Sequence, residues 1–214
     1  MRGLKTVFLL ILSMIGISVN AAEKISGSVM LTGGRTTIGP NSDDYSFNDF
    51  HLTGNIILND SYFASLTHSN QKHSSTGKNH KHKFYWTKVG YQIPLSNILE
   101  VNSLDTMKVF ASIGYFTSKW LYAGQFPDNT GSGSSYSIGA RFAPLDQVEL
   151  ILEVSPLRYN SGSLNGKHQR ITELTATYFL SDKVGLNVAY HKNDSRWVGG
   201  LGGTSWSTGI ELRF

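Results

Sequence analysis

The sequence predicts an all-β protein, a transmembrane antiparallel up-and-down β-barrel of ten strands. Three observations predict this class. An apolar segment near the start has the form of an export signal, the remaining chain alternates between apolar and polar positions, and clusters of polar turn residues interrupt it. No later apolar run reaches the length of a membrane-spanning helix. The mature chain, 22–214, is long enough for one domain, which we expect to be the barrel.

The first segment, 1–21, is predicted to be a cleaved signal peptide. Arg2 and Lys5 precede an apolar run over 7–17, and Ala21 ends a small-residue cleavage site. A positive start, an apolar core of this length and small residues at the cleavage site are typical of export signals. The run is too short for a stable membrane span. The chain has no cysteine, which excludes a disulfide framework and a lipid-modified N-terminal cysteine.

The alternation of side chains places the strands along the mature chain. The ten strands are expected at 24–35, 46–59, 61–72, 81–93, 107–118, 134–145, 147–159, 169–180, 183–194 and 204–214. The segment 94–106 is too long for a tight turn. It holds either a short helical turn or a register error that would reduce ten strands to eight.

Alternation alone does not distinguish a membrane barrel from a soluble one, because a soluble half-buried strand alternates in the same way. The distinction depends on which face points into the barrel. In the last strand, Ile210, Leu212 and Phe214 alternate with small or charged residues. The polar face of most strands consists of Gly, Ser, Thr and Asn with scattered charges. Such a face would form a poor dry core, but it suits the crowded interior of a small barrel whose apolar face meets lipid.

Charged residues with polar-face parity are expected to point into the lumen. This set comprises Asp49, Lys88, Lys108, Arg141, Glu149, Glu153, Glu173, Glu211 and Arg213. Opposite charges in near balance inside a narrow barrel would form pairs and fill it, since enclosed charges are costly without partners. We therefore expect a filled lumen, with a narrow channel as an alternative.

Aromatic residues are expected in two belts at the two membrane interfaces, which a soluble sheet has no reason to form. One belt, on the periplasmic side, would contain Tyr62, Tyr91, Phe142, Tyr178 and Phe214. The other, on the outer side, would contain Tyr85, Tyr115, Tyr136, Tyr190 and Trp206. The orientation follows from the connections, because membrane barrels have short periplasmic turns and longer outer loops. Short turns are expected at 59–61, 145–147 and 181–183, and longer loops at 36–45, 73–80, 119–133, 160–168 and 195–203.

Basic residues gather at the predicted outer end. The candidate contacts to lipopolysaccharide are Lys72, Lys78, Lys81, Lys83, Lys167, Arg170, Lys192 and Arg196. Lys and Arg pair with the phosphates and carboxylates of that lipid, although solvation alone explains any single lysine. The basic balance could also suit nucleic acid, but an exported barrel has no routine access to it. We expect a monomer.

Histidines and carboxylates at the outer end raise two further hypotheses. His73, His80 and His82 share one basic stretch and are weak candidates for a metal site. We expect no cofactor. An enzyme at the rim, a protease or a lipid A hydrolase, would use His68-Ser69, His191 with Asp194, or Asp43-Asp44. Adjacent residues on a strand point to opposite faces, which counts against His68-Ser69 as a nucleophile and base. We expect no enzyme.

The export signal, the alternating strands, the segment 84–91 (FYWTKVGY) and the ending 209–214 (GIELRF) resemble small outer-membrane β-barrel proteins, of the porin-family or OmpX/Ail type. The resemblance implies a bacterial outer-membrane protein without catalytic residues. It also implies that the barrel-assembly machinery reads the terminal aromatic strand as an assembly signal, carried by Trp206, Ile210, Leu212 and Phe214. The function expected from the whole sequence is a non-enzymatic barrel with a basic rim on lipopolysaccharide, serving envelope integrity or surface contact.

Overall fold

The computed structural model describes residues 24–38, 46–73, 80–99, 104–121, 128–195 and 203–214. The signal peptide predicted at 1–21 lies outside these ranges. The described residues form a short helix, α2 (Ser96–Leu99), and ten strands. The strands are β1 (Ile25–Ile38), β2 (Ser46–Leu58), β3 (Tyr62–His73), β4 (Lys81–Pro94), β5 (Met107–Leu121), β6 (Asn129–Leu145), β7 (Val148–Gly162), β8 (His168–Ser181), β9 (Val184–Ser195) and β10 (Gly203–Arg213). The helix is too short to cross a membrane, and no other helix occurs in these ranges.

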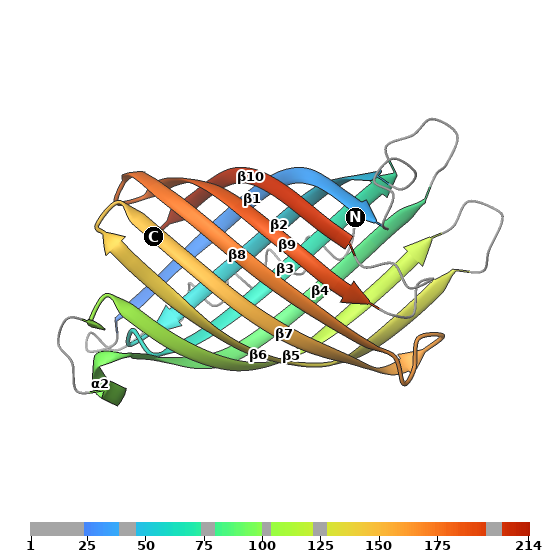
Figure 1. Ribbon diagram of the computed structural model, residues 1–214, viewed down its shortest axis with the longest axis horizontal. Helices are drawn as coiled ribbons and strands as arrows, with labels where there is room; N and C mark the ends of the chain where they lie inside the picture. The colour runs from blue at the N-terminus through green and yellow to red at the C-terminus, as the bar shows by residue number, and fades with distance from the viewer. Residues whose placement is uncertain (1–23, 39–45, 74–79, 100–103, 122–127, 196–202) are drawn as a thin grey trace.

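The strands form one closed antiparallel barrel in which each strand pairs with its neighbours in sequence (Figure 1). β1 pairs with β10 and completes the ring, so that no strand is left with an unpaired edge. The up-and-down topology with ten strands is confirmed. The long connection after β4 contains α2, which explains its length and excludes the eight-stranded alternative.

The connections at the two ends of the barrel differ in length. One end, called here the turn end, carries α2, the start of β1, the end of β10 and the short β2–β3, β6–β7 and β8–β9 turns (Figure 1). In the β2–β3 turn, Asn59 and Asp60 have φ angles of 52° and 56°, a conformation that Asn and Asp tolerate better than most residues. The opposite end, called the loop end, carries the longer connections.

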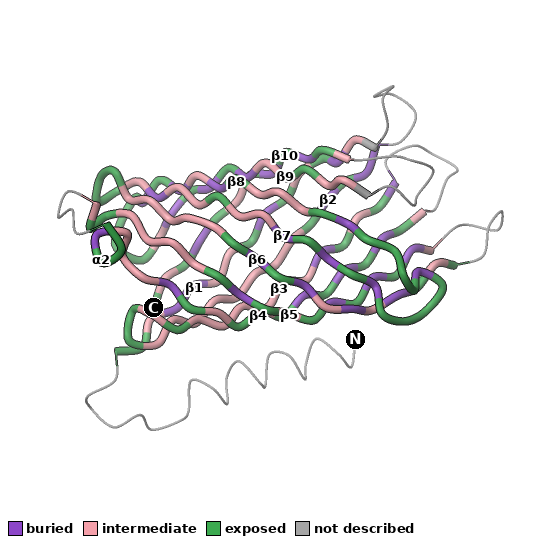
Figure 2. The backbone as a smooth tube through the Cα atoms, turned by 60° about the horizontal axis from the view of Figure 1, so that its bottom comes forward, coloured by how far each residue is buried: buried purple, intermediate pink, exposed green. Residues whose placement is uncertain are grey.

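The apolar face of the barrel points outward. Leu152, Val188 and Leu212 are 48%, 45% and 52% exposed. Glu153 and Arg213 lie on the inner face, where their side chains take part in ion pairs. Buried and exposed residues consequently alternate along most strands (Figure 2). A soluble barrel would show the reverse, so the transmembrane arrangement is confirmed.

Exposed aromatic side chains occur toward both ends of the outward face. Tyr62, Tyr91, Tyr178 and Phe214 lie toward the turn end. Tyr85, Tyr115, Tyr136 and Trp206 lie toward the loop end. Phe142 and Tyr190, which also belong to the predicted belts, are partly exposed. Neighbouring rings make contact across strands: the Tyr62 and Tyr91 centroids are 5.0 Å apart, and those of Tyr190 and Trp206 are 4.9 Å apart.

The loop predicted at 119–133 is wrong over much of its length. β5 continues to Leu121 and β6 begins at Asn129, and the two strands pair as far as Trp120 with Asn129. The Gly- and Ser-rich composition of the start of β6 indicated a loop, but the glycines allow close pairing with β7. A Cβ atom on Gly133 would lie 1.8 Å from the Arg158 carbonyl oxygen. Glycine is required there by the approach of the neighbouring backbone.

Candidate functional site

An ion pair crosses the middle of the lumen between β4 and β7. Lys88 Nζ lies 2.7 Å and 2.9 Å from the two carboxylate oxygens of Glu153. Ser155 also donates to Glu153, at 2.7 Å. The Lys88 ammonium additionally lies 4.1 Å from the Trp86 ring centroid, a cation–π contact. Both charged side chains are nearly enclosed, at 10% and 12% exposure.

A second charge cluster lies closer to the turn end, centred on Arg213. Its guanidinium donates to Glu149 at 3.0 Å and to Glu211 at 3.1 Å. Arg141 approaches Glu149 at 3.7 Å from the neighbouring β6. The Arg213 guanidinium carbon lies 3.6 Å from the Phe179 ring centroid. The cluster therefore combines two cations and two carboxylates of the charge set expected in the lumen.

The remaining charges of this set have separate positions. Asp49 is buried and accepts a hydrogen bond from Thr36. Glu173 lies 3.4 Å from His191 Nδ1. Lys108 lines the lumen cavity near the turn end, and among the described residues it forms no ion pair. The structure thus joins six of the nine charges to each other and leaves three with other neighbours.

A cluster of aromatic side chains fills the lumen next to β4, β5 and β7, toward the loop end. This cluster was not predicted from the sequence. Phe84, Trp86, Phe116 and Tyr159 pack with Leu157 and with Leu164 from the β7–β8 hairpin. Phe116 is fully buried and meets Tyr159 edge-on at 4.8 Å. The Trp86 indole donates to Ser135 at 2.7 Å. The polar-face parity of these residues could have indicated this cluster, because large aromatic residues recur at lumen positions of β4 and β5.

The histidines proposed as weak metal ligands are held differently. His82 is buried, with Nδ1 2.9 Å from Gln71 and Nε2 2.9 Å from Ser118, and its ring stacks on Trp120 at 3.9 Å. Both ring nitrogens of His82 are therefore hydrogen-bonded to protein side chains. The His73 and His80 rings contact each other edge-on at 5.8 Å. No cluster of three His, Cys, Asp or Glu able to hold a metal ion occurs in the described part of the chain.

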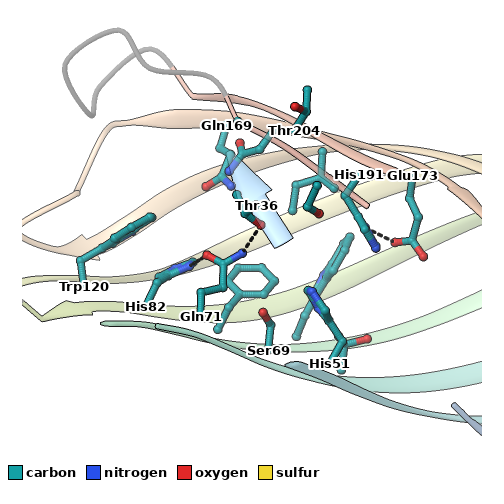
Figure 3. Close-up of a pocket in the computed structure, with 17 residues that line it drawn as sticks. Thr36, His51, Ser69, Gln71, His82, Trp120, Gln169, Glu173, His191 and Thr204 are labelled. Atoms are coloured by element: carbon teal, nitrogen blue, oxygen red, sulfur yellow. Dashed lines mark hydrogen bonds and ion pairs between the residues drawn. The ribbon is translucent and has the colours of Figure 1, made fainter. Parts of the chain in front are cut away.

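Among the described residues, two cavities lie in line along the lumen of the barrel. The larger, of about 450 Å³, extends from the turn end, where Asp60 and Gln92 line it. The smaller, of about 110 Å³, extends toward the loop end, where Thr36, Trp120 and Thr204 line it (Figure 3). The two cavities have five lining residues in common: His51, Thr67, Trp86, Glu173 and His191. These five residues, called here the partition, border both cavities.

Two imidazoles form the centre of the partition, an arrangement that the sequence reasoning missed. The His51 and His191 rings are nearly parallel, 9° apart, with centroids separated by 5.2 Å. Glu173 lies beside His191 (Figure 3), and Asp49 Oδ2 is 3.9 Å from His51 Nε2. The even-odd alternation placed both histidines on the polar face, but it carried no information on their contact.

The residues named for a rim enzyme are not assembled into one. His191 lines the lumen, whereas Asp194 faces outward and pairs with Arg170 at 3.1 Å, so these two do not form a dyad. His68 stacks on Tyr85 at 4.4 Å on the outward face, while Ser69 is buried on the inward face. Asp43 and Asp44 lie outside the described residues.

The basic residues at the loop end divide into paired and unpaired groups. Arg170 and Lys192 both contact Asp194, at 3.1 Å and 3.6 Å. Lys72 and Lys81 are direct cross-strand neighbours, and so are Lys83 and Lys119. These four lysines, called here the lysine patch, are exposed and form no ion pair with a described residue. Lys167 is exposed in the β7–β8 hairpin, and Lys78 and Arg196 lie outside the described residues.

The C-terminal residue completes the ring of strands. Phe214 N donates to the Gly27 carbonyl at 3.0 Å, and Gly27 N donates to the Phe214 carbonyl at 3.0 Å. The Phe214 ring lies over Gly27, where a Cβ atom would be 2.6 Å from it. Trp206, Ile210, Leu212 and Phe214 are all exposed on the outward face.

Fold and polarity together define the class of protein: a closed transmembrane β-barrel. No family model matches the chain, and no curated protein matches it. Solved structures that resemble it include the β-domain of the Bordetella autotransporter BrkA, at 11% identity and a TM-score of 0.49, covering 88% of this chain and 98% of that one. Ail of Yersinia pestis has 12% identity and a TM-score of 0.42, covering 90% and 98%. Neisserial surface protein A has 9% identity and a TM-score of 0.42, covering 90% and 99%. These likenesses concern the fold alone.

Proposed function

We propose that this chain is a non-enzymatic barrel of the bacterial outer membrane whose loop end faces outward and contacts lipopolysaccharide. The lysine patch is the observation that carries the proposal. Like charges directly opposite each other on neighbouring strands are destabilising, so four exposed lysines without partners are not explained by folding. A layer of phosphate-bearing lipid would neutralise them. A role in envelope integrity or surface contact would follow from this anchorage.

The position of the lysine patch on the outward wall supports a lipid headgroup as its partner. Lys83 precedes the exposed Tyr85 by two residues on β4, and Lys119 follows Thr117 and Tyr115 on the same face of β5. Tyrosine is enriched at the level of the headgroups in membrane proteins. The lysines therefore lie one step beyond the apolar band, at the depth where lipid phosphates are expected. On the β8–β9 side, Arg170 and Lys192 share the Asp194 carboxylate, which offsets one of their two positive charges.

Replacing Lys72, Lys81, Lys83 and Lys119 together by Gln is expected to weaken binding of lipopolysaccharide by the purified barrel at least tenfold. Each lysine near an anionic surface contributes on the order of 1 kcal/mol. Binding is measured as the lipid A that co-purifies with the folded barrel, quantified by mass spectrometry at low and high salt. The variant Arg170→Gln/Lys192→Gln is the matched control and is expected to retain most of the binding. Equal lipid A on all three proteins would contradict the proposal.

We also propose that the barrel-assembly machinery is a partner during biogenesis and reads the outward aromatic face that ends at Phe214. Deleting Phe214 removes two backbone hydrogen bonds to Gly27, each of about 1 kcal/mol. Much less folded barrel is expected in the membrane fraction, whereas Phe214→Tyr, which retains ring and backbone, is expected to assemble normally. The measurement is the heat-modifiable band of the folded barrel on detergent gels. Normal assembly of the deletion variant would argue against this role of Phe214.

A further inference from the structure

The stacked pair of His51 and His191 lies where the two lumen cavities meet. His51 projects from β2 and His191 from β9, strands separated in the sheet by β1 and β10. The cavity on one side of the pair reaches the turn end, and the cavity on the other side reaches residues at the ends of β1, β4 and β10 on the loop side. The partition is therefore the shared boundary of two cavities that together extend along the lumen.

The larger cavity is suited to water and small ions, whereas the wall of the smaller one combines polar side chains with the rings of Phe84, Trp86 and Trp120. The larger cavity is lined by the charge pairs of Lys88 and Arg213 together with Ser, Thr and Asn side chains. Asp49 Oδ1, His51 Nε2 and Ser65 Oγ are buried without a hydrogen-bond partner among the described residues. In folded proteins, buried polar atoms of this kind are hydrogen-bonded by water.

The charges around the imidazole pair come from several strands. Asp49 on β2 approaches His51 at 3.9 Å, and Glu173 on β8 approaches His191 at 3.4 Å. Farther toward the turn end, Lys88 on β4 is bound to Glu153 on β7, and toward the loop end the buried imidazole of His82, also on β4, lines the smaller cavity with its two nitrogens hydrogen-bonded to Gln71 and Ser118. The neighbouring lumen residues of β1, β3 and β10 that line the smaller cavity are uncharged, namely Thr36, Thr67, Ser69, Gln71, Gly203, Thr204 and Ser205. Each imidazole thus has a carboxylate of its own beside it.

We propose that the lumen is a path for small inorganic ions and that the His51–His191 stack is its acid-opened gate. This function goes beyond lipid contact and does not depend on it. While at most one ring is charged, the parallel rings remain stacked and close the boundary between the cavities. When both rings gain a proton, two like charges 5.2 Å apart repel each other. Each imidazolium is then attracted to its own carboxylate, His51 to Asp49 and His191 to Glu173, and the stack separates.

The gate is tested by conductance of the purified full-length barrel in planar bilayers containing KCl. The wild-type barrel is expected to conduct at least about tenfold more often at about pH 5 than at about pH 7.5, the range in which imidazole titrates. His51→Gln/His191→Gln keeps side chains of similar length that cannot be charged, and it is expected to remain closed at both pH values. His51→Ala/His191→Ala removes the barrier and is expected to conduct at both.

Two controls make each result decisive. His168→Ala alters an exposed histidine at the start of β8 and is expected to behave like the wild type. Heat-modifiable migration shows that each variant is a folded barrel before its conductance is recorded. A wild-type barrel that stays closed at acid pH overturns the proposal, as does acid opening that persists in the Gln variant. A folded Ala variant without conductance overturns it as well, because the path would then be blocked elsewhere.

Discussion

Replacing Lys88 with Met is expected to destabilise the folded barrel by about 3–5 kcal/mol, the cost of leaving an enclosed charge without its partner. Lys88 contributes both of the short contacts to Glu153, at 2.7 Å and 2.9 Å, and the carboxylate is 12% exposed. Once the ammonium is removed, Ser155 alone remains bonded to that carboxylate. The loss is measured as the free energy of unfolding in urea, followed by tryptophan fluorescence in lipid vesicles.

A double-mutant cycle separates the ion pair from the packing of the lysine stem. Lys88→Met/Glu153→Gln removes both charges and is expected to recover most of the stability lost in the single variant. The exposed pair of Lys24 and Asp60, 2.8 Å apart, is the matched control, and Lys24→Met is expected to cost at most about 1 kcal/mol. The Lys24 contact also lowers the pKa of the Asp60 carboxyl. A single variant at Lys88 as stable as the wild type would show that Glu153 is well solvated.

The second large effect on stability is expected from a charge placed on the outward face of the barrel wall. Leu152→Arg is expected to destabilise the barrel by about 2–4 kcal/mol, because the side chain lies within the apolar band of β7 and would carry its charge into the lipid core. Leu180→Arg is the matched control. Leu180 is also exposed, at 62%, but lies next to the last residue of β8 at the turn end, where a cost of about 0–1 kcal/mol is expected.

The comparison of the two leucine variants tests the inside-out polarity directly. Both are measured by urea unfolding in lipid vesicles and in detergent micelles. If the two substitutions cost the same, the outward face at Leu152 is not embedded more deeply than that at Leu180. If Leu152→Arg were neutral, an apolar band around the barrel would be contradicted.

Much of the fold could be predicted because alternation is a local property. A strand shows successive side chains to opposite faces, so the parity of Leu152 against Glu153, or of Leu212 against Arg213, follows from the order of the residues. The ends of the strands could not be predicted equally well. Gly131 and Gly133 have the composition of a loop, and only their pairing with β5 and β7 makes them part of a strand.

The site was predictable as a list of lumen residues but not as a set of contacts. His51 and His191 are separated by 140 positions, and Lys88 and Glu153 by 65, on strands that are not adjacent in the sheet. The partners of each charge depend on the register of every intervening strand and on the closure of the ring. The same holds for the lysine patch, because cross-strand register determines that Lys83 lies beside Lys119.

The sequence by itself determined the class of the molecule: an antiparallel barrel, an apolar side and a polar side to each strand, and a set of charges on the polar side; the structure decided for ten strands over eight. These features depend only on residues that are close along the chain. Over such short distances, the backbone geometry of a strand sets the direction of each side chain. Only the tertiary structure decided that two imidazoles meet between two cavities, that Glu153 is bound by Lys88, and that four lysines remain unpaired while Arg170 does not. Closure of the ring brings distant strands across a lumen a few side chains wide, and no local pattern encodes which residues meet there.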